Sequence, residues 1–203
     1  MTATAHPPQA MLADYAAGTL SRGMTLAVAA HLGLCPRCRD RAARLASLCG
    51  ALFATCAEPV PPSSRCLEAA LARLETEVAP PPREVALPDP LCRCLATPSR
   101  ALVWRGAGPG LSRCRLEGFP AEEVGLVRAQ PGARVPPHGH SGPEATVVLE
   151  GGLLDDGRTY RRGDIAFCDE TVEHSPEVVG TDACLYLVVA SAPPRPLTAG
   201  IPA

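Results

Sequence analysis

The apolar residues in the first third of the chain recur every three or four positions, the spacing of amphipathic helices. This pattern predicts four helices, at residues 9–18, 25–35, 36 to about 55, and from Ser63 or Ser64 onward. The fourth helix carries Leu67, Leu71 and Leu74 along one stripe. That stripe either packs on the other three helices or is left to dock in the groove of a partner.

The pattern changes after residues 78–90, a proline-rich stretch that predicts an extended, semi-rigid linker. Beyond it, short β-type runs at 124–127, 146–149, 165–167 and 184–189 are separated by Gly, Pro and Asp turns. The triplet Asp155-Asp156-Gly157 is a strong hairpin signal. We therefore predict a helical domain at 1–77, the linker, and an all-β barrel or sandwich at 91–195.

The composition and net charge of the chain argue against nucleic acid and membranes as direct partners. The formal net charge is -2 and aromatic residues make up 3 %, which argues against bulk nucleic-acid binding and base stacking. The N-terminus lacks the basic and apolar regions of a secretory signal, and the longest apolar stretch, 26–34, is too short to span a bilayer. We expect a soluble cytoplasmic protein that contacts neither nucleic acid nor a membrane directly.

In a cytoplasmic protein, the ten cysteines are expected as metal ligands, small buried residues or redox sensors rather than disulfides. His31, Cys35 and Cys38 form an H-x3-C-x2-C motif. The spacing puts His31 and Cys35 on one face of a helix, and Cys38 in the first turn of the next helix, where the helix dipole stabilises a thiolate. Two thiolates and an imidazole match a structural zinc site.

A closed zinc site needs a fourth ligand from elsewhere in the chain. His6 is the other histidine in this half of the sequence, and Cys49 or Cys56 could take its place. Without a metal, the motif would be a helix-turn-helix with two buried cysteines and a partly exposed histidine.

A second group of ligands occurs in the β region, where residues 132–151 fit the pattern G-x5-H-x-H-x3-E-x6-G. Residues i and i+2 of a strand point to the same face, so His138 and His140 point together, and Glu144 reaches back after a turn. His174 follows after the next predicted strand. Three imidazoles and a carboxylate suit Zn, Mn, Fe, Ni or Cu, so the set does not select the metal. The alternative is a metal-free barrel with polar cavity residues.

This motif resembles the first motif of the cupin superfamily, and the resemblance covers roughly residues 90–192. It implies a jelly-roll β-barrel. The second cupin motif is degenerate, because Cys168 stands at the usual Pro position and no Asn follows His174. The departure weakens an enzymatic interpretation.

A helical H-x3-C-x2-C domain, a proline-rich linker and a cupin-like region together resemble the ChrR type of anti-sigma factor. The resemblance includes the first-helix segment at residues 13–20. It implies an N-terminal zinc domain that inhibits an extracytoplasmic-function sigma factor, and a cupin-like domain that responds to singlet oxygen or peroxide. It also implies two metal sites, with zinc expected in both. Their ligands are His6, His31, Cys35 and Cys38 in the first, and His138, His140, Glu144 and His174 in the second.

The route of the stress signal stays open in the sequence. One hypothesis is oxidation of a thiol at or near the second metal, with Cys168 and Cys184 as candidates and the Cys92-Arg-Cys94 pair as another. The alternative is that Cys168 and Cys184 are small core residues. We interpret the chain as a regulator and not an enzyme. The alternatives are a metal-dependent cupin enzyme, such as a dioxygenase or isomerase, and a small-molecule sensor.

Overall fold

The structure is a computed structural model that describes residues 3–56, 58, 61–76, 88, 91 and 102–197. Its helices are α1 (Gln9–Ala17), α2 (Arg22–Leu34), α3 (Pro36–Cys56) and α4 (Ser64–Thr76). The four predicted helices are therefore confirmed. Nearly all of the predicted linker, 78–90, lies outside the described residues, as does the Cys92 and Cys94 pair. The domain boundaries remain predictions.

Two helix ends follow local chemistry. Gly18 ends α1 with a φ of 73°, in the left-handed region that favours glycine. Helix α2 begins at Arg22 rather than Thr25, because the Ser21 hydroxyl accepts a hydrogen bond from the Met24 N–H and caps the helix. In the described part of the chain, no helix has the length and apolar character needed to cross a membrane.

The β region consists of short antiparallel strands in three sheets. The largest has the order β1-β2-β3-β11-β5-β8, and the smaller ones are β10-β6-β7 and β12-β4-β9. The strands are β1 (Arg105–Gly108), β2 (Leu111–Arg115), β3 (Glu123–Ala129), β4 (His138–Gly139), β5 (Glu144–Glu150), β6 (Gly152–Asp155), β7 (Arg158–Arg161), β8 (Ile165–Cys168), β9 (Glu173–His174), β10 (Glu177–Val178), β11 (Cys184–Ala190) and β12 (Arg195–Pro196). A helical region followed by antiparallel sheets is confirmed, while closure into a barrel stays a prediction.

The hairpin between β6 and β7 has the turn that the sequence predicts. Asp155 pairs with Arg158, so the loop has two residues, Asp156 and Gly157. Both have positive φ angles, 43° and 72°. This is the backbone pattern of a type I′ turn, whose twist matches the flanking strands. The turn places Asp155 at the end of β6, beside the second ligand group.

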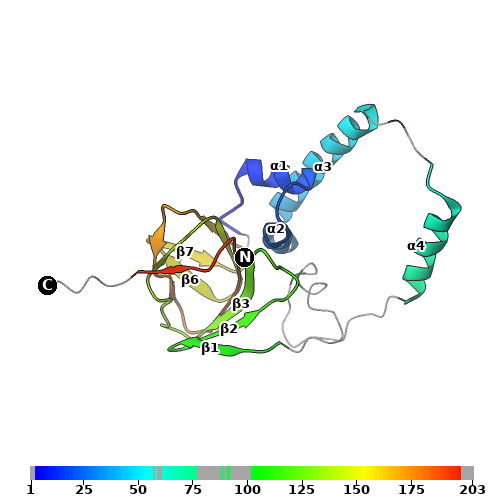
Figure 1. Cartoon of the computed structure of the whole chain (residues 1–203). Coiled ribbons are helices and arrows are strands. Elements are labelled where there is room, and N and C mark those ends of the chain that lie inside the picture. Colours follow the sequence, from blue (N-terminus) through cyan, green and yellow to red (C-terminus); the bar gives the residue numbers. More distant parts are fainter. Residues whose placement is uncertain are drawn as a thin grey trace.

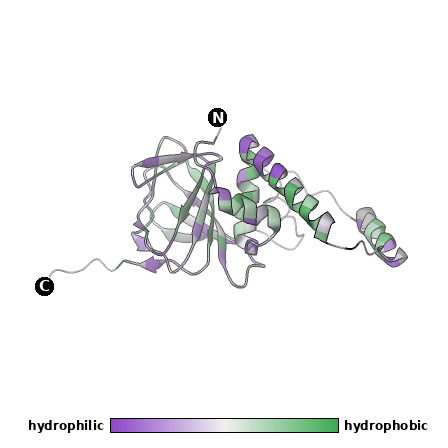
Figure 2. Ribbon diagram, turned by 90° about the horizontal axis from the view of Figure 1, so that it is seen from above, coloured by the Kyte–Doolittle hydropathy of each residue, from purple (hydrophilic) through white to green (hydrophobic). Residues whose placement is uncertain are grey.

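The two faces of the six-stranded sheet have different neighbours. One face packs against α2, which lies across β5 and β11, and forms a core that includes Ala27, Ala30 and Leu187. The opposite face belongs to a second core with Val127 and Tyr186. Helices α1 to α3 and the sheets thus form adjoining layers (Figures 1 and 2). Since α2 covers this sheet face, the helical region and the cupin-like region share one continuous apolar core.

Candidate metal centres

The structure brings together the four residues of the first predicted site. The candidate ligand atoms of His6, His31, Cys35 and Cys38 all lie within 4.8 Å of one another. His6 Nδ1 is 3.6 Å from Cys35 Sγ and 3.4 Å from Cys38 Sγ. Neither Cys49 nor Cys56 belongs to the cluster. We call these four residues the N-terminal cluster.

The backbone around Cys35 differs from the prediction. His31 and Cys35 were predicted on one helix, but Cys35 is the extended residue that follows α2, with φ −118° and ψ 98°. The reason is Pro36, because the residue before a proline is disfavoured in the helical region. The Cys35 N–H still donates to the His31 carbonyl oxygen at 2.8 Å. Cys38 lies in the first turn of α3, as predicted.

The surroundings of His31 prepare it to bind a cation. The side chain is fully buried, and its Nδ1 lies 2.7 Å from the Gly163 carbonyl oxygen, so Nδ1–H donates to that carbonyl. Burial lowers the pKa of His31 to about 4, which keeps the ring neutral. Its Nε2 is buried and has no hydrogen-bond partner among the residues that the structure describes. A neutral imidazole with a free, buried lone pair is the form that ligates a metal.

The two thiols complete a donor set that suits zinc. Burial, together with the adjacent Cys35, raises the pKa of the Cys38 thiol to about 11. A thiolate pair in this position therefore requires a positive charge beside it. Two sulfurs and two imidazoles are a common ligand set for a closed tetrahedral zinc site, and the residues fit that ion.

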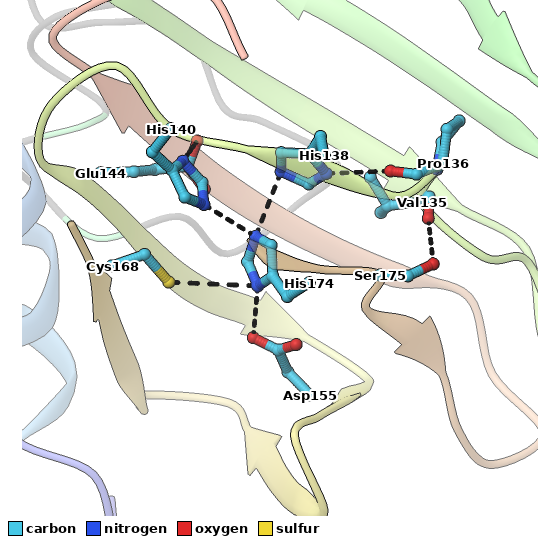
Figure 3. A network of polar contacts seen from close by, with 9 residues as sticks. All are labelled: Val135, Pro136, His138, His140, Glu144, Asp155, Cys168, His174 and Ser175. Atoms are coloured by element: carbon cyan, nitrogen blue, oxygen red, sulfur yellow. Dashed lines mark hydrogen bonds and ion pairs between the residues drawn. The ribbon is translucent and has the colours of Figure 1, made fainter. Parts of the chain in front are cut away.

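The second predicted set also converges, and we call it the cupin cluster. The candidate ligand atoms of His138, His140, Glu144 and His174 lie within 4.8 Å of one another. His174 Nε2 is 3.1 Å from the Nε2 atoms of both His138 and His140 (Figure 3). His140 Nδ1 is 3.6 Å from Glu144 Oε2. The three Nε2 atoms thus face one point.

The short sheet β12-β4-β9 and strand β5 position these ligands. His138 on β4 pairs directly with His174 on β9, which brings together residues far apart in the sequence. His140 follows β4, and Glu144 begins β5. The turn between β4 and β5 contains Gly142, whose φ of 153° and closeness to Ser191 leave no room for a larger residue.

Further hydrogen bonds orient the imidazoles from outside the cluster. His138 Nδ1–H donates to the Pro136 carbonyl oxygen at 2.9 Å. His174 Nδ1 is 2.8 Å from a carboxylate oxygen of Asp155 (Figure 3). Both contacts leave Nε2 directed toward the centre, and hydrogen bonds of this kind orient the histidine ligands of metal sites. Asp155 was not predicted as part of this site, because its place in an Asp-Asp-Gly turn already had a structural explanation.

The protonation preferences of this cluster differ among its members. Burial lowers the pKa of His138, and it lowers that of His140 to about 4. Burial raises the pKa of Glu144. For His174, burial lowers the pKa, but hydrogen bonds with Asp155 and Cys168 outweigh it and raise the pKa to about 10. A cation bound here would replace a proton on His174, and the Asp155 carboxylate would then support the ligated imidazole.

The cupin cluster opens onto a cavity of about 290 Å³. Apolar side chains such as Leu111, Val127 and Val188 line much of it, and His138 and His174 lie in its wall. Cys168 is half-buried at the same place, with Sγ 4.0 Å from His174 Nδ1. Cys184, the other thiol singled out in the sequence, is fully buried in the core, and burial raises its pKa to about 12.

Comparison with known proteins gives matches over both regions. The family model of the ChrR cupin-like domain matches residues 95–192. A zinc-finger family model matches residues 9–39, which include His31, Cys35 and Cys38 but not His6. The chain is 35 % identical over 199 residues to the anti-sigma-E factor ChrR of Cereibacter sphaeroides, covering 96 % of this chain and 93 % of that protein.

A solved structure is similar over nearly the whole chain. It is the crystal structure of Rhodobacter sphaeroides SigE in complex with the anti-sigma ChrR, with a TM-score of 0.74 and 32 % sequence identity. The match covers 92 % of this chain and 98 % of the matched one. It therefore includes the helical region as well as the sheets.

Proposed function

The chain belongs to the ChrR family of anti-sigma factors, and we propose that it binds and inhibits an extracytoplasmic-function sigma factor through its helical N-terminal region. The relative of similar structure is an anti-sigma protein in complex with the sigma factor SigE. A family of regulators gives no support to the enzymatic alternative, which we set aside.

The observation that supports the proposal is a set of exposed apolar side chains on α3 and α4. These side chains are 51 to 73 % exposed. They are Leu48, Leu52, Phe53, Leu67 and Leu71. Figures 1 and 2 show the end of α3 and all of α4 projecting away from the other helices and the sheets. We call this set the α3–α4 apolar surface.

The exposure of α4 bears on an alternative that the sequence left open. Residues 65–73 are all exposed, so these side chains are not buried against the other three helices. Exposing the apolar side of an amphipathic helix to water is unfavourable in free energy. Such a helix commonly docks in a groove of a partner protein. The proposed occupant is the sigma factor, because this chain belongs to a family whose structural relative is bound to one.

We propose that zinc in the N-terminal cluster shapes this binding region. Its ligands come from the segment before α1, from α2, and from the residues that open α3. A single ion would therefore link the segment before α1, which we call the arm, to two helices. It would also fix the direction in which α3 leaves the domain. Loss of the ion would release these constraints.

The cupin cluster is proposed to hold a second divalent metal, with zinc the expected ion, and to receive an oxidative signal of the singlet-oxygen or peroxide type. The support is its four converging donors beside an accessible cavity, with a half-buried thiol nearby. A response at this cluster would release the sigma factor. Because sigma factors act with RNA polymerase, the proposal places the chain in the cytoplasm.

The test is binding to sigma factors. Purified full-length chain is mixed with each extracytoplasmic-function sigma factor of the same organism, and complexes are separated by size-exclusion chromatography. The proposal expects a stable complex with one of them and loss of that sigma factor's binding to core RNA polymerase. A metal-loaded, folded chain that binds none of them would refute the proposal.

A further inference from the structure

The arm that carries His6 is anchored by the cupin-like region. The backbone N–H groups of Thr4 and Ala5 donate to one carboxylate oxygen of Asp164, at 2.5 and 2.8 Å. The other oxygen accepts from the Arg161 N–H at 2.7 Å. Asp164 is 2 % exposed. Burial alone would raise its pKa, but these backbone hydrogen bonds outweigh burial and hold the pKa below its ordinary value.

The same turn also contacts the other imidazole of the N-terminal cluster. Gly163 and Asp164 lie in the three-residue connection between β7 and β8, and the Gly163 carbonyl oxygen accepts from His31 Nδ1–H at 2.7 Å. Gly163 has a φ of 92°, which a residue with a side chain adopts only under strain. Two adjacent residues of one turn therefore support both His6 and His31.

We propose that the β7–β8 turn of the cupin-like region is a structural part of the N-terminal metal centre. Asp164 positions the arm that presents His6, and the Gly163 carbonyl fixes the tautomer and the orientation of His31. Both are positioning residues that act through a ligand and do not touch the ion. The inference rests on the proposed metal centre and adds that its affinity for metal depends on contact between the two regions.

Strand β8 connects the β7–β8 turn to the cupin cluster, so a change at the cupin cluster can reach the N-terminal cluster. Strand β8 starts directly after Asp164 and ends at Cys168, which pairs with Glu144 of the cupin cluster. Cys168 Sγ is also 4.0 Å from His174 Nδ1. A displacement of β8 at the cupin cluster would therefore move the residues that hold His6 and His31. If such a displacement changes metal affinity at the N-terminal cluster, thermodynamic linkage requires metal bound there to change the affinity of the cupin cluster by the same factor.

The experiment measures Co²⁺ affinity in the full-length chain. All proteins carry Cys168→Ser, because Cys168 is grouped with Asp155 and His174 and its thiol could otherwise bind cobalt at the cupin cluster. In this background, thiolate-to-cobalt charge-transfer absorption reports on the N-terminal cluster. Asp164→Ala removes the acceptor for the arm, while Asp182→Ala removes an exposed aspartate of the same region and is the matched control. We expect Asp164→Ala to weaken cobalt binding by about 10- to 100-fold, the size of loss seen when a group that orients a metal ligand is removed, and Asp182→Ala to leave it unchanged.

A second variant keeps the test decisive if Asp164→Ala does not fold. Arg158 Nη2 donates to the Thr4 carbonyl oxygen at 3.2 Å from an exposed position, so Arg158→Ala loosens the same arm without touching the turn. It is expected to give a smaller loss of cobalt affinity. If both variants fold and bind cobalt as tightly as the Cys168→Ser parent chain, the role of the β7–β8 turn is refuted, while the metal centre itself still stands. Absence of the charge-transfer band in the parent chain would overturn the metal centre itself, whatever the chain does with sigma factors.

Discussion

Truncation of Phe53 tests the α3–α4 apolar surface most sharply. Phe53 lies near the end of α3 and is 73 % exposed, the largest exposed fraction among the large apolar residues. Phe53→Ala removes a ring that belongs to no hydrophobic core of the described residues, so the unfolding free energy is expected to change by no more than about 0.5 kcal/mol. Any effect on the complex therefore comes from the contact with the partner.

The expected loss of binding free energy follows from the exposed surface of Phe53 that a partner could bury. Complete burial of a phenylalanine side chain stabilises by about 1.5–3 kcal/mol. Since Phe53 is 73 % exposed, burial against a partner contributes ~1–2 kcal/mol. Loss of that contribution weakens the complex by about 5- to 30-fold.

The assay is titration of the sigma factor with the full-length chain, followed by calorimetry or fluorescence anisotropy. The matched control is Val103→Ala, which truncates another side chain that is 60 % exposed but lies in the cupin-like region. We expect Val103→Ala to bind as tightly as the unmodified chain. Equal affinities for Phe53→Ala and the control would refute the assignment of this surface to the partner.

Three further predictions concern the two clusters and the fold. Asp155→Asn should weaken Zn²⁺ binding at the cupin cluster by about 10- to 100-fold in titration calorimetry, because Asp155 supports His174, whereas the exposed neighbour Asp156→Asn should not. Gly151→Ala should lower the unfolding free energy in urea by about 1–3 kcal/mol, since its Cβ would lie 2.7 Å from the Ala183 carbonyl oxygen at a φ of 71°. Gly157→Ala, with a similar φ but no atom within 4 Å, should cost less, and equal losses would contradict the steric argument. Zinc affinity of the N-terminal cluster, measured by chelator competition, should rise with pH, because the Cys38 thiol has a pKa of about 11 and must lose its proton to bind; an affinity independent of pH between about 6 and 8 would contradict thiolate ligation.

The sequence predicted most candidate ligands of the two clusters from their spacing within short segments, and the structure brings these residues together. His31 and Cys38 lie within two consecutive helices, and the pattern from His138 to Glu144 spans one turn between strands. Local geometry decides such arrangements, so a motif predicts them well. His6 carried no such spacing, and its place depends on the fold of the arm.

The residues that sequence reasoning missed make long-range contacts. Asp164 bonds to Thr4, which is 160 positions away, and nothing near either residue signals that contact. The packing of α2 on the six-stranded sheet was also missed, although a signal existed. Strand β11 is buried along nearly its whole length rather than at alternate positions, and its run of apolar residues is typical of a strand covered on both faces.

The central claim is that a metal-dependent N-terminal region binds a sigma factor. The most direct measurement is co-expression of the full-length chain with its extracytoplasmic-function sigma factor, followed by co-purification and metal analysis. The account predicts that the unmodified chain and Cys49→Ala, a half-buried cysteine of α3 outside the cluster, retain zinc and the partner. Cys35→Ala and Cys38→Ala should lose both. A complex that survives in these variants after their N-terminal zinc is gone would contradict the account.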